Sequence, residues 1–296
     1  MDRAMKTLFK DARDYQILFL STFLILGIST RDWTLRADLM FVVIASCLVT
    51  QWLFVSGVPF LSAKTRLLPD LTDSPPKSPP LVSSLRSALI TGLGLCLLLR
   101  ANDWKTMALA GFLAIASKFI CSWRGKHFFN PANFGIIAAL VLTPDAWVSP
   151  GQWGTDWWYL LLFAGAGGIV LHRVGRWDTS ATFLATYAGL ETARTFWLGQ
   201  GWDVSIHQLS SGSLLLFALF MLTDPRSIPD ARVGRLVWSV AIASVAFILQ
   251  YQYYLSTAIF WTLFAFSPLT LILDAIWKQE RFNWIPNLPN PIPRVN

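Results

Sequence analysis

Long apolar stretches without charged residues constrain this chain more than any other feature of its sequence. Leu39–Leu61, Val204–Thr223 and Leu236–Leu273 contain no Asp, Glu, Lys or Arg. An α-helix needs roughly 20 apolar residues to cross a bilayer. Only 14% of the 296 residues are charged, against about 25% in a typical soluble domain. The sequence therefore predicts an all-α integral membrane protein that forms one polytopic domain over residues 1–296.

About ten segments are predicted to cross the membrane, and several have Trp residues at their ends, as in aromatic belts. The domain divides into a first helical pair at 15–62, a Pro-rich cytoplasmic linker at 63–83, a helical core at 84–276 and a cytoplasmic tail at 277–296. The predicted spans are Gln16–Thr30, Leu39–Leu61, Ser84–Leu99, Thr106–Trp123, Pro131–Leu142, Trp157–Val174, Ser180–Leu198, His207–Leu222, Leu236–Gln250 and Tyr253–Ile276.

The positive charges predict the orientation of these spans. With ten spans, both termini and every second loop lie on one side of the membrane. That side holds 19 of the 24 Lys and Arg residues, and the opposite loops hold four. Cytoplasmic loops carry the excess of Lys and Arg, so both termini are predicted to be cytoplasmic. The net charge of +7 is thereby explained by topology, and no basic cluster interleaved with aromatic residues predicts nucleic-acid binding.

A helix start inside apolar sequence marks the first candidate site. Asn130-Pro131 follows Lys126–Phe129 and precedes the fifth span. Asn is a favoured N-cap, and Pro fits the first helical position. A break of this kind is tolerated in a membrane only where protein packs around it or where it lines a site. A bound ligand or a gate is therefore expected near Asn130.

Two further polar elements are candidates, each with a simpler alternative. Thr223-Asp224-Pro225 ends an uncharged helix at the same predicted level as Asn130. Its carboxylate could bind a cation or the edge of a cofactor, or it could close the helix through an Asx turn. Ser87 and Thr91 share a face of the third span, where small and hydroxyl residues commonly serve helix packing.

Other chemistries have little support. The three Cys residues are isolated and lack the spacing of metal ligands. Three His residues near span ends leave paired haem ligands conceivable but weakly supported. The sequence contains no Walker loop, dinucleotide fingerprint, zinc-protease helix or nucleophile elbow.

Three segments in order resemble one membrane-protein family. They are Ser87–Leu93, Lys118–Ala132 and Leu209–Pro225. Together they resemble the RnfD component of the Rnf electron-transport complex and its relative, the NqrB component of the sodium-pumping NADH:quinone oxidoreductase. The resemblance covers approximately residues 84–275.

The resemblance implies a channel-like inverted-repeat fold of ten helices, related to urea and ammonium channels, and a role in moving electrons across the membrane. It also implies a noncovalent flavin, riboflavin or FMN, near the cytoplasmic side. Thr91 and Asn130 match family positions that contact this flavin, and Thr223 and Asp224 match an element implicated in cation coupling. We add Ser87, His127 and Asn133 as further cofactor-binding candidates, although His127 stands where some members have Asn.

The flavin ring system needs polar partners at its edges and apolar walls on its faces. Thr91, Asn130 and Asn133 are expected to supply the polar partners. Phe128, Phe129 and Phe134 are expected to supply the walls.

This sequence departs from the family at the second flavin, an FMN esterified to a Thr in a Ser-x-Ala-Thr motif of a long extracytoplasmic loop. The corresponding segment, Pro144–Asp156, is short and lacks the motif. Ser180-Ala181-Thr182 is similar but lies one span later and on the other side, and Ser180 is a better candidate for a helix N-cap. No covalent FMN is therefore expected.

Two functions follow as expectations. The chain is either a flavin-holding subunit of an electron-transport complex, or a redox-inactive transporter, channel or structural anchor within a larger membrane assembly. The first function implies other membrane or peripheral electron-transport subunits as partners, with a quinone as one candidate acceptor. Both place the chain in the cytoplasmic (inner) membrane of a bacterium.

Overall fold

The computed structural model describes residues 11–31, 36–57, 81–148, 157–282 and 284 and is mostly helical. Its first set of helices comprises α2 (Ala12–Arg31), α3 (Ala37–Trp52) with a π-helical turn η1 (Leu53–Gly57), α5 (Leu81–Leu98), α6 (Trp104–Ile120) and α7 (Pro131–Leu142). The second set comprises α8 (Trp157–Val174), α9 (Trp177–Leu198), α10 (Trp202–Leu209), α11 (Gly212–Leu216) continued by the π-helical turn η2 (Phe217–Met221), α12 (Arg232–Gln252), α13 (Ala258–Phe266) and α14 (Leu269–Ile276).

The two sets pack internally in the same way. In the first, α2 contacts α5, α3 contacts α6, and α6 contacts α7. In the second, α8 contacts α11 and η2, α9 contacts α12, and α12 contacts α13. When α10 to η2 count as one segment, the same positions of each set pair with one another, as a repeat of five segments requires. The inverted orientation of the repeats stays a prediction.

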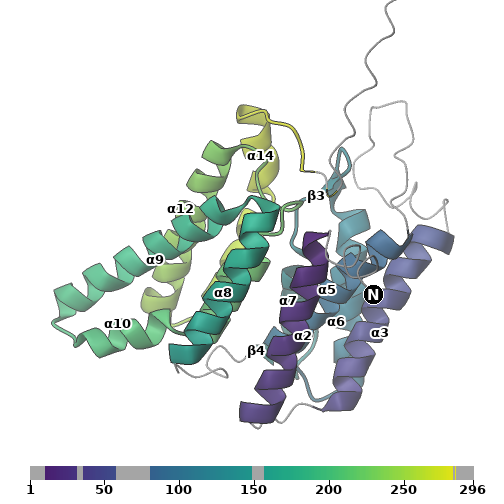
Figure 1. Ribbon diagram of the computed structural model, residues 1–296, viewed down its shortest axis with the longest axis horizontal. Coiled ribbons are helices and arrows are strands. Elements are labelled where there is room, and N and C mark those ends of the chain that lie inside the picture. Colours follow the sequence, from purple (N-terminus) through teal and green to yellow (C-terminus); the bar gives the residue numbers. More distant parts are fainter. Residues whose placement is uncertain (1–10, 32–35, 58–80, 149–156, 283, 285–296) are drawn as a thin grey trace, which may run out of the picture.

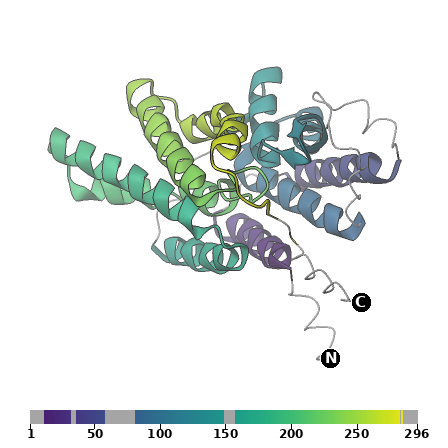
Figure 2. The ribbon, with the colours of Figure 1, turned by 90° about the horizontal axis from the view of Figure 1, so that it is seen from above.

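The two sets lie side by side. Figures 1 and 2 show α2–α7 on one side and α8–α14 on the other, and contacts join α2 to α8 and α7 to α13. The structure also contains two very short antiparallel strand pairs, which the all-α prediction did not include. They are β1 (Leu99–Arg100) with β4 (Trp147–Val148), and β2 (Ser122–Trp123) with β3 (Lys126–His127).

The β2–β3 hairpin positions the start of α7. Its two turn residues, Arg124 and Gly125, both have positive φ angles, 49° and 77°; two-residue hairpin turns of this kind match the twist of the strands. The Nζ atom of Lys126 then reaches the carboxylates of Asp230 (3.2 Å) and of Asp274 on α14 (2.6 Å). These ion pairs fasten the hairpin, and with it the segment leading to Asn130, to the second set of helices.

Each of the ten predicted spans corresponds to a helix or to a bent helix pair in the described chain. The fifth and sixth have the predicted bounds, whereas the eighth and the tenth are broken. Among the described residues three helical segments are long and apolar enough to cross a membrane, and five if each bent pair forms one span. The three are Ala37–Ser56, Leu81–Leu98 and Arg232–Gln252, and the bent pairs are α10 with α11–η2 (46°) and α13 with α14 (50°). Ten crossings and the cytoplasmic orientation therefore remain predictions.

The first and last described segments meet on one face of the molecule. The guanidinium of Arg13, at the start of α2, lies 4.7 Å from the centre of the Trp284 ring. At the other end of α2, Thr30 forms a hydrogen bond with Tyr159 at the start of α8. Residues 63–80 of the predicted linker and most of the predicted tail lie outside the described residues, while residues 81–83 already belong to α5.

Candidate functional site

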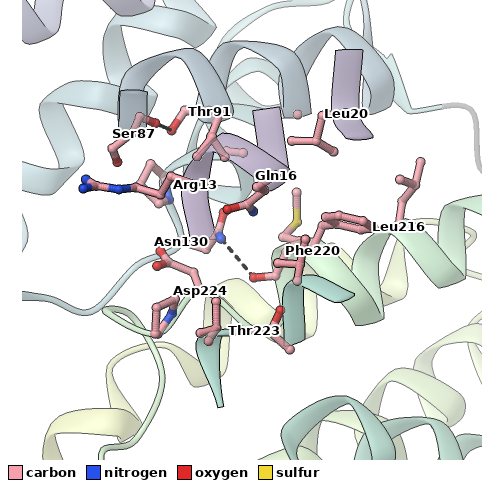
Figure 3. Close-up of a pocket in the computed structure, with 18 of the residues that line it drawn as sticks. Arg13, Gln16, Leu20, Ser87, Thr91, Asn130, Leu216, Phe220, Thr223 and Asp224 are labelled. Carbon is pink, nitrogen blue, oxygen red and sulfur yellow. Dashed lines mark hydrogen bonds between the residues drawn. The ribbon is translucent and has the colours of Figure 1, made fainter. Parts of the chain in front are cut away.

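A cavity lies between the two sets of helices at the face where Arg13 and Trp284 meet. Five of the seven predicted site residues line it: Ser87, Thr91, Asn130, Thr223 and Asp224. In Figure 3, Ser87 and Thr91 approach from α5, Thr223 and Asp224 come from the segment after η2, and Asn130 lies between these groups. The apolar part of the wall comes mainly from α2, α5, α7, α8 and the segment α11–η2, and includes Leu20, Ile90, Leu97, Leu98, Pro131, Ala132, Val170, Leu171, Val174, Leu216, Phe220 and Met221.

Asn130 joins the two sets of helices through its side chain. Its Oδ1 accepts a hydrogen bond from the backbone N–H of Asn133 (3.0 Å), so Asn130 is the N-cap of α7, as predicted. Its Nδ2 donates to the carbonyl of Met221 (3.0 Å), the last residue of η2. Carbonyls in the last turn of a helix lack their usual partner within that helix; this one accepts the short bond from the Asn130 amide and a longer bond from the N–H of Asp224 (3.5 Å).

Ser87 and Thr91 place hydroxyl groups on the opposite wall. Thr91 Oγ1 donates to the carbonyl of Ser87 one turn earlier (3.0 Å), which leaves its lone pairs directed at other groups. The Oγ of Ser87 accepts from the Nζ of Lys118 (3.1 Å), which also donates to Gln51 Oε1 (3.3 Å). A half-buried ammonium group held by neutral oxygens therefore lies directly behind this wall.

Asp224 is held by the protein on both carboxylate oxygens. Oδ1 accepts from the backbone N–H of Arg226 (3.2 Å), which is the Asx turn considered as the alternative from sequence. Oδ2 lies 3.5 Å from Nε2 of His127. Thr223 donates to the carbonyl of Leu219 (2.9 Å). His127 does not line the cavity itself but supports Asp224 from behind.

The protonation of this pair follows from its surroundings. Burial lowers the pKa of His127 below its ordinary value, although the nearby Asp224 carboxylate opposes that effect. Burial acts to raise the pKa of Asp224, but the contact with His127, its charge and the Arg226 N–H together bring that pKa below its ordinary value. We therefore assign a neutral imidazole beside an ionised carboxylate.

This assignment predicts how stability depends on pH. Because the folded pKa of His127 is lowered, the unfolded chain binds the His proton more readily, so folded stability falls as pH decreases through about 6.5. The loss for Asp224 comes only in more acidic solution, as pH falls through its lowered pKa. We expect His127→Gln to flatten the dependence of the thermal unfolding midpoint on pH near 6.5. His172→Gln, which changes an exposed side chain of α8, should leave it unaltered; equal curves for wild type and His127→Gln would contradict the assignment.

Asn133 and the predicted aromatic walls face away from the cavity. The Nδ2 of Asn133 donates to the carbonyl of Phe260 on α13 (3.1 Å). Phe129 stacks on Phe264 of α13 with ring centres 4.9 Å apart, and Phe134 packs against both rings. The prediction that Phe128, Phe129 and Phe134 form the cofactor walls was therefore wrong for this cavity: Phe129 and Phe134 pack against α13, and Phe128 packs against Phe129.

Sequence reasoning also missed the contribution of α2. Arg13, Gln16 and Leu20 line the cavity together with Trp284. Their spacing of three, four and seven residues places them on one helical face, a signal that was available in the sequence. Arg13 is engaged by the Asp11 carboxylate and donates to the carbonyl of Ser83 (2.8 Å). The amide of Gln16 makes no hydrogen bond within the described part of the chain, so it is free to meet a ligand.

The prediction that Ser180 is a helix N-cap is also corrected by the structure. α9 begins at Trp177, three residues before Ser180, and Arg176 occupies the N-cap position. The Oγ of Ser180 donates to the carbonyl of Ala218 within η2 (2.5 Å). π-Helical turns are rare and occur frequently at functional sites, and this one is held by Ser180 on one side and by Asn130 on the other.

Comparison with known proteins shows which family part of the chain resembles. Residues 148–283 match the model of the NQR2, RnfD, RnfE family. This part of the chain, slightly less than half of it, is similar to that family. The match includes Thr223 and Asp224 but begins after α7, so Asn130 and Thr91 lie in the part of the chain that the family model does not cover. The helical fold, the candidate spans and the family together make this a multi-pass membrane protein.

Curated relatives of the family extend the match toward the N-terminus. The RnfD-type component of the ion-translocating oxidoreductase complex of Pseudomonas aeruginosa is 24% identical over 225 residues, which cover 55% of this chain and 65% of that protein. The protein of the same name from Halorhodospira halophila is 36% identical over 114 residues, 37% of this chain and 32% of that protein. The one from Ectopseudomonas mendocina is 22% identical over 287 residues, 75% and 83% respectively. The chain thus spans slightly less than two thirds of the length of the first of these relatives.

Proposed function

We propose that this chain is a membrane subunit of an electron-transfer complex and holds one noncovalent flavin, riboflavin or FMN, in the cavity between α2, α5, α8 and η2. The observation that carries the proposal is the convergence of Ser87, Thr91, Asn130, Thr223 and Asp224 on one cavity from three segments far apart in sequence. When bound, a flavin would accept and release electrons. The residues of this chain bind it, orient it and keep the surroundings largely free of water.

The donors and acceptors of the cavity fit this role. The edge of the ring system that resembles uracil offers both carbonyl oxygens and an N–H group, which match an amide such as that of Gln16. Thr91 Oγ1 can accept a hydrogen bond from the same ligand, because its proton is committed to Ser87. The Asn130 amide is already satisfied on both atoms, so its role is to fix the shape of the wall.

The size of the cavity adds a requirement. Its volume is about 80 Å³, whereas pockets for ligands of drug size are typically about 300–1,000 Å³. Binding therefore needs the side chains at the opening to move. Arg13 and Trp284 stack on one another over the start of α2, and we propose that these two side chains open on binding.

The partners in this proposal are other electron-transport subunits. The relatives carry the name of one component of a larger complex, which supports a partner role for this chain as well. A quinone as electron acceptor and the absence of covalent FMN stay predictions from sequence. Residues 149–156 of the loop on which the covalent-FMN prediction rests lie outside the described residues.

The experiment is the visible spectrum of the purified full chain, alone and with its complex, together with two matched variants. Thr91 and Thr262 are both buried, and each donates to the carbonyl four residues earlier, but only Thr91 lines the cavity. Loss of one neutral hydrogen bond costs about 0.5–1.5 kcal/mol, so Thr91→Val should reduce flavin affinity roughly two- to tenfold. Thr262→Val should leave it unchanged.

The same preparation separates the alternatives. A flavin that absorbs at about 450 nm and is released on denaturation, without a fluorescent band on a denaturing gel, agrees with the proposal. A fluorescent band would contradict the predicted absence of covalent FMN. Protein without flavin, both alone and in its complex, would favour the redox-inactive anchor, transporter or channel.

A further inference from the structure

The carboxylate of Glu191 is an unusual feature in the second set of helices. Glu191 lies in α9, has 0% exposed surface, and neither of its oxygens has a hydrogen-bond partner within the described residues. A buried carboxylate without partners is costly, and an ion in this situation is either paired or neutralised by a proton or another cation.

Its neighbours supply oxygen atoms and one incomplete ion pair. The hydroxyl of Tyr251 on α12 faces Glu191, and it too is buried without a partner in the described part of the chain. The hydroxyl of Tyr187, one turn before Glu191, donates to Gln250 Oε1 (2.7 Å). The guanidinium of Arg194 lies 4.0 Å from Glu191 Oε1, at the outer limit of an ion pair. The titratable groups that face Glu191 are thus Tyr187 and Arg194 from α9 and Tyr251 from α12.

Arg194 is directed toward other groups. Its Nη1 donates to Gln200 Oε1 (3.2 Å), its guanidinium stacks 4.0 Å from the centre of the Tyr251 ring, and its side chain is 27% exposed. Glu191 and Arg194 are three residues apart on α9, a spacing at which opposite charges commonly pair. The structure brings them near without a hydrogen bond between them, so Arg194 leaves the carboxylate incompletely compensated.

A second carboxylate on the same helix is an example of a buried negative charge that is fully paired with a cation. Asp178 receives hydrogen bonds from Nε and Nη2 of Arg235 at 2.6–3.2 Å. Glu191 is 13 residues further along α9, or about 20 Å along the helix axis. It is therefore a separate polar cluster, remote from the end of α9 at which Ser180 contacts η2.

We propose that Glu191 is a binding site for a small monovalent cation, a proton or Na⁺, with the hydroxyl oxygen of Tyr251 as its neighbouring ligand. A protonated Glu191 would be neutral and could donate to Tyr251, which satisfies both orphaned groups at once. A bound Na⁺ would be held by the same oxygens, which are the ligand type that hard cations prefer. No group of three or more His, Cys, Asp or Glu side chains suited to a metal ion occurs in the described chain, so a site of low charge fits better than a divalent one. This inference does not depend on the flavin.

The experiment is labelling of the full chain in detergent with dicyclohexylcarbodiimide, which reacts with protonated carboxyl groups in apolar surroundings, followed by mass spectrometry of the Glu191 and Asp178 peptides. Glu191 should be labelled and Asp178 should not, because both oxygens of Asp178 accept hydrogen bonds from Arg235. For a proton site, labelling of Glu191 should fall as pH is raised and should not respond to Na⁺. For a sodium site, Na⁺ should slow labelling, whereas K⁺ at equal ionic strength should not.

Two variants test the assignment further. Glu191→Gln should abolish the label on that peptide, and Tyr251→Phe should weaken the response to pH or to Na⁺ without removing the label. If Glu191 in the wild-type chain is labelled no more than Asp178, or is labelled without any response to pH or Na⁺, the proposal is overturned. Glu191 would then form a static ion pair with Arg194. The wild-type comparison decides the matter even if a variant fails to fold.

Discussion

We expect the Asn130→Ala protein to lose about 1–3.5 kcal/mol of its unfolding free energy and most of its affinity for any ligand of the cavity. Removal of an N-cap side chain typically costs about 0.5–2 kcal/mol. The substitution also removes the Asn130 hydrogen bond to the buried carbonyl of Met221, which keeps only the longer bond from the N–H of Asp224 (3.5 Å), and loss of one neutral hydrogen bond costs about 0.5–1.5 kcal/mol. Both losses fall at the junction of the two sets of helices, so the cavity wall should lose its shape. Thermal or denaturant unfolding in detergent measures the first effect, and flavin titration measures the second.

A serine at the same position separates the two contributions. Asn130→Ser keeps an oxygen that can cap α7 but is too short to reach Met221, so it should recover the capping part only. Unfolding free energies of Asn130→Ala and wild type that agree within about 0.5 kcal/mol would show that neither bond stabilises the protein. If Asn130→Ser equals wild type, the bond to Met221 contributes nothing.

The start of α7 could be predicted because its causes are local. An Asn followed by Pro in apolar surroundings specifies an N-cap within four residues of chain, and both the cap and the bounds Pro131–Leu142 agree with the structure. The sixth span was equally accessible, since Trp157 and the charged pair after Leu171 delimit it. Local capping and periodicity are sufficient for such elements.

The breaks inside the long apolar runs were not predicted. The eighth span is broken between Leu209 and Gly212, and its second part changes to a π-helical turn. The tenth span is broken between Phe266 and Leu269. Hydropathy gives no signal for a bend of this kind, but Gly212 and Pro268 stand at the two breaks and are local signals that the prediction of unbroken spans did not use. The π-helical turn that follows the first break is contacted by residues distant in sequence, Ser180 at Ala218 and Asn130 at Met221.

The prediction of which side chains form the cavity walls failed for a related reason. Phe129 and Phe134 flank Asn130 in sequence, but helical geometry directs Phe134 toward α13 while Asn130 faces η2. The actual walls come from α2, α5, α8 and η2, and no local pattern around Asn130 indicates which of these helices lies beside it. The polar half of the site was therefore predictable from its motifs, whereas the apolar half depended on the tertiary arrangement.

A second large effect is expected at the buried ion pair of Asp178 and Arg235. Their side chains are only 7% and 6% exposed, and Arg235 also donates to the carbonyl of Asp230 (2.6 Å). Arg235→Met keeps the apolar stem but leaves Asp178 with the neutral donors of Thr179 and with a more distant cation, Arg232, which is 66% exposed and 3.8 Å away. Removing one partner of a buried pair costs about 3–5 kcal/mol, because the remaining charge is uncompensated.

The comparison with an exposed pair tests whether burial is the cause. Arg36 and Asp38 form a similar pair with side chains 59% and 57% exposed, so Arg36→Met should cost no more than about 1 kcal/mol. The double variant Asp178→Asn with Arg235→Met should regain most of the stability lost in Arg235→Met, because no buried charge is left unpaired. An Asp178→Asn/Arg235→Met protein as unstable as Arg235→Met would show that the loss comes from packing and from the bond to Asp230. In that case charge compensation would not be what holds α9 and α12 together at this end.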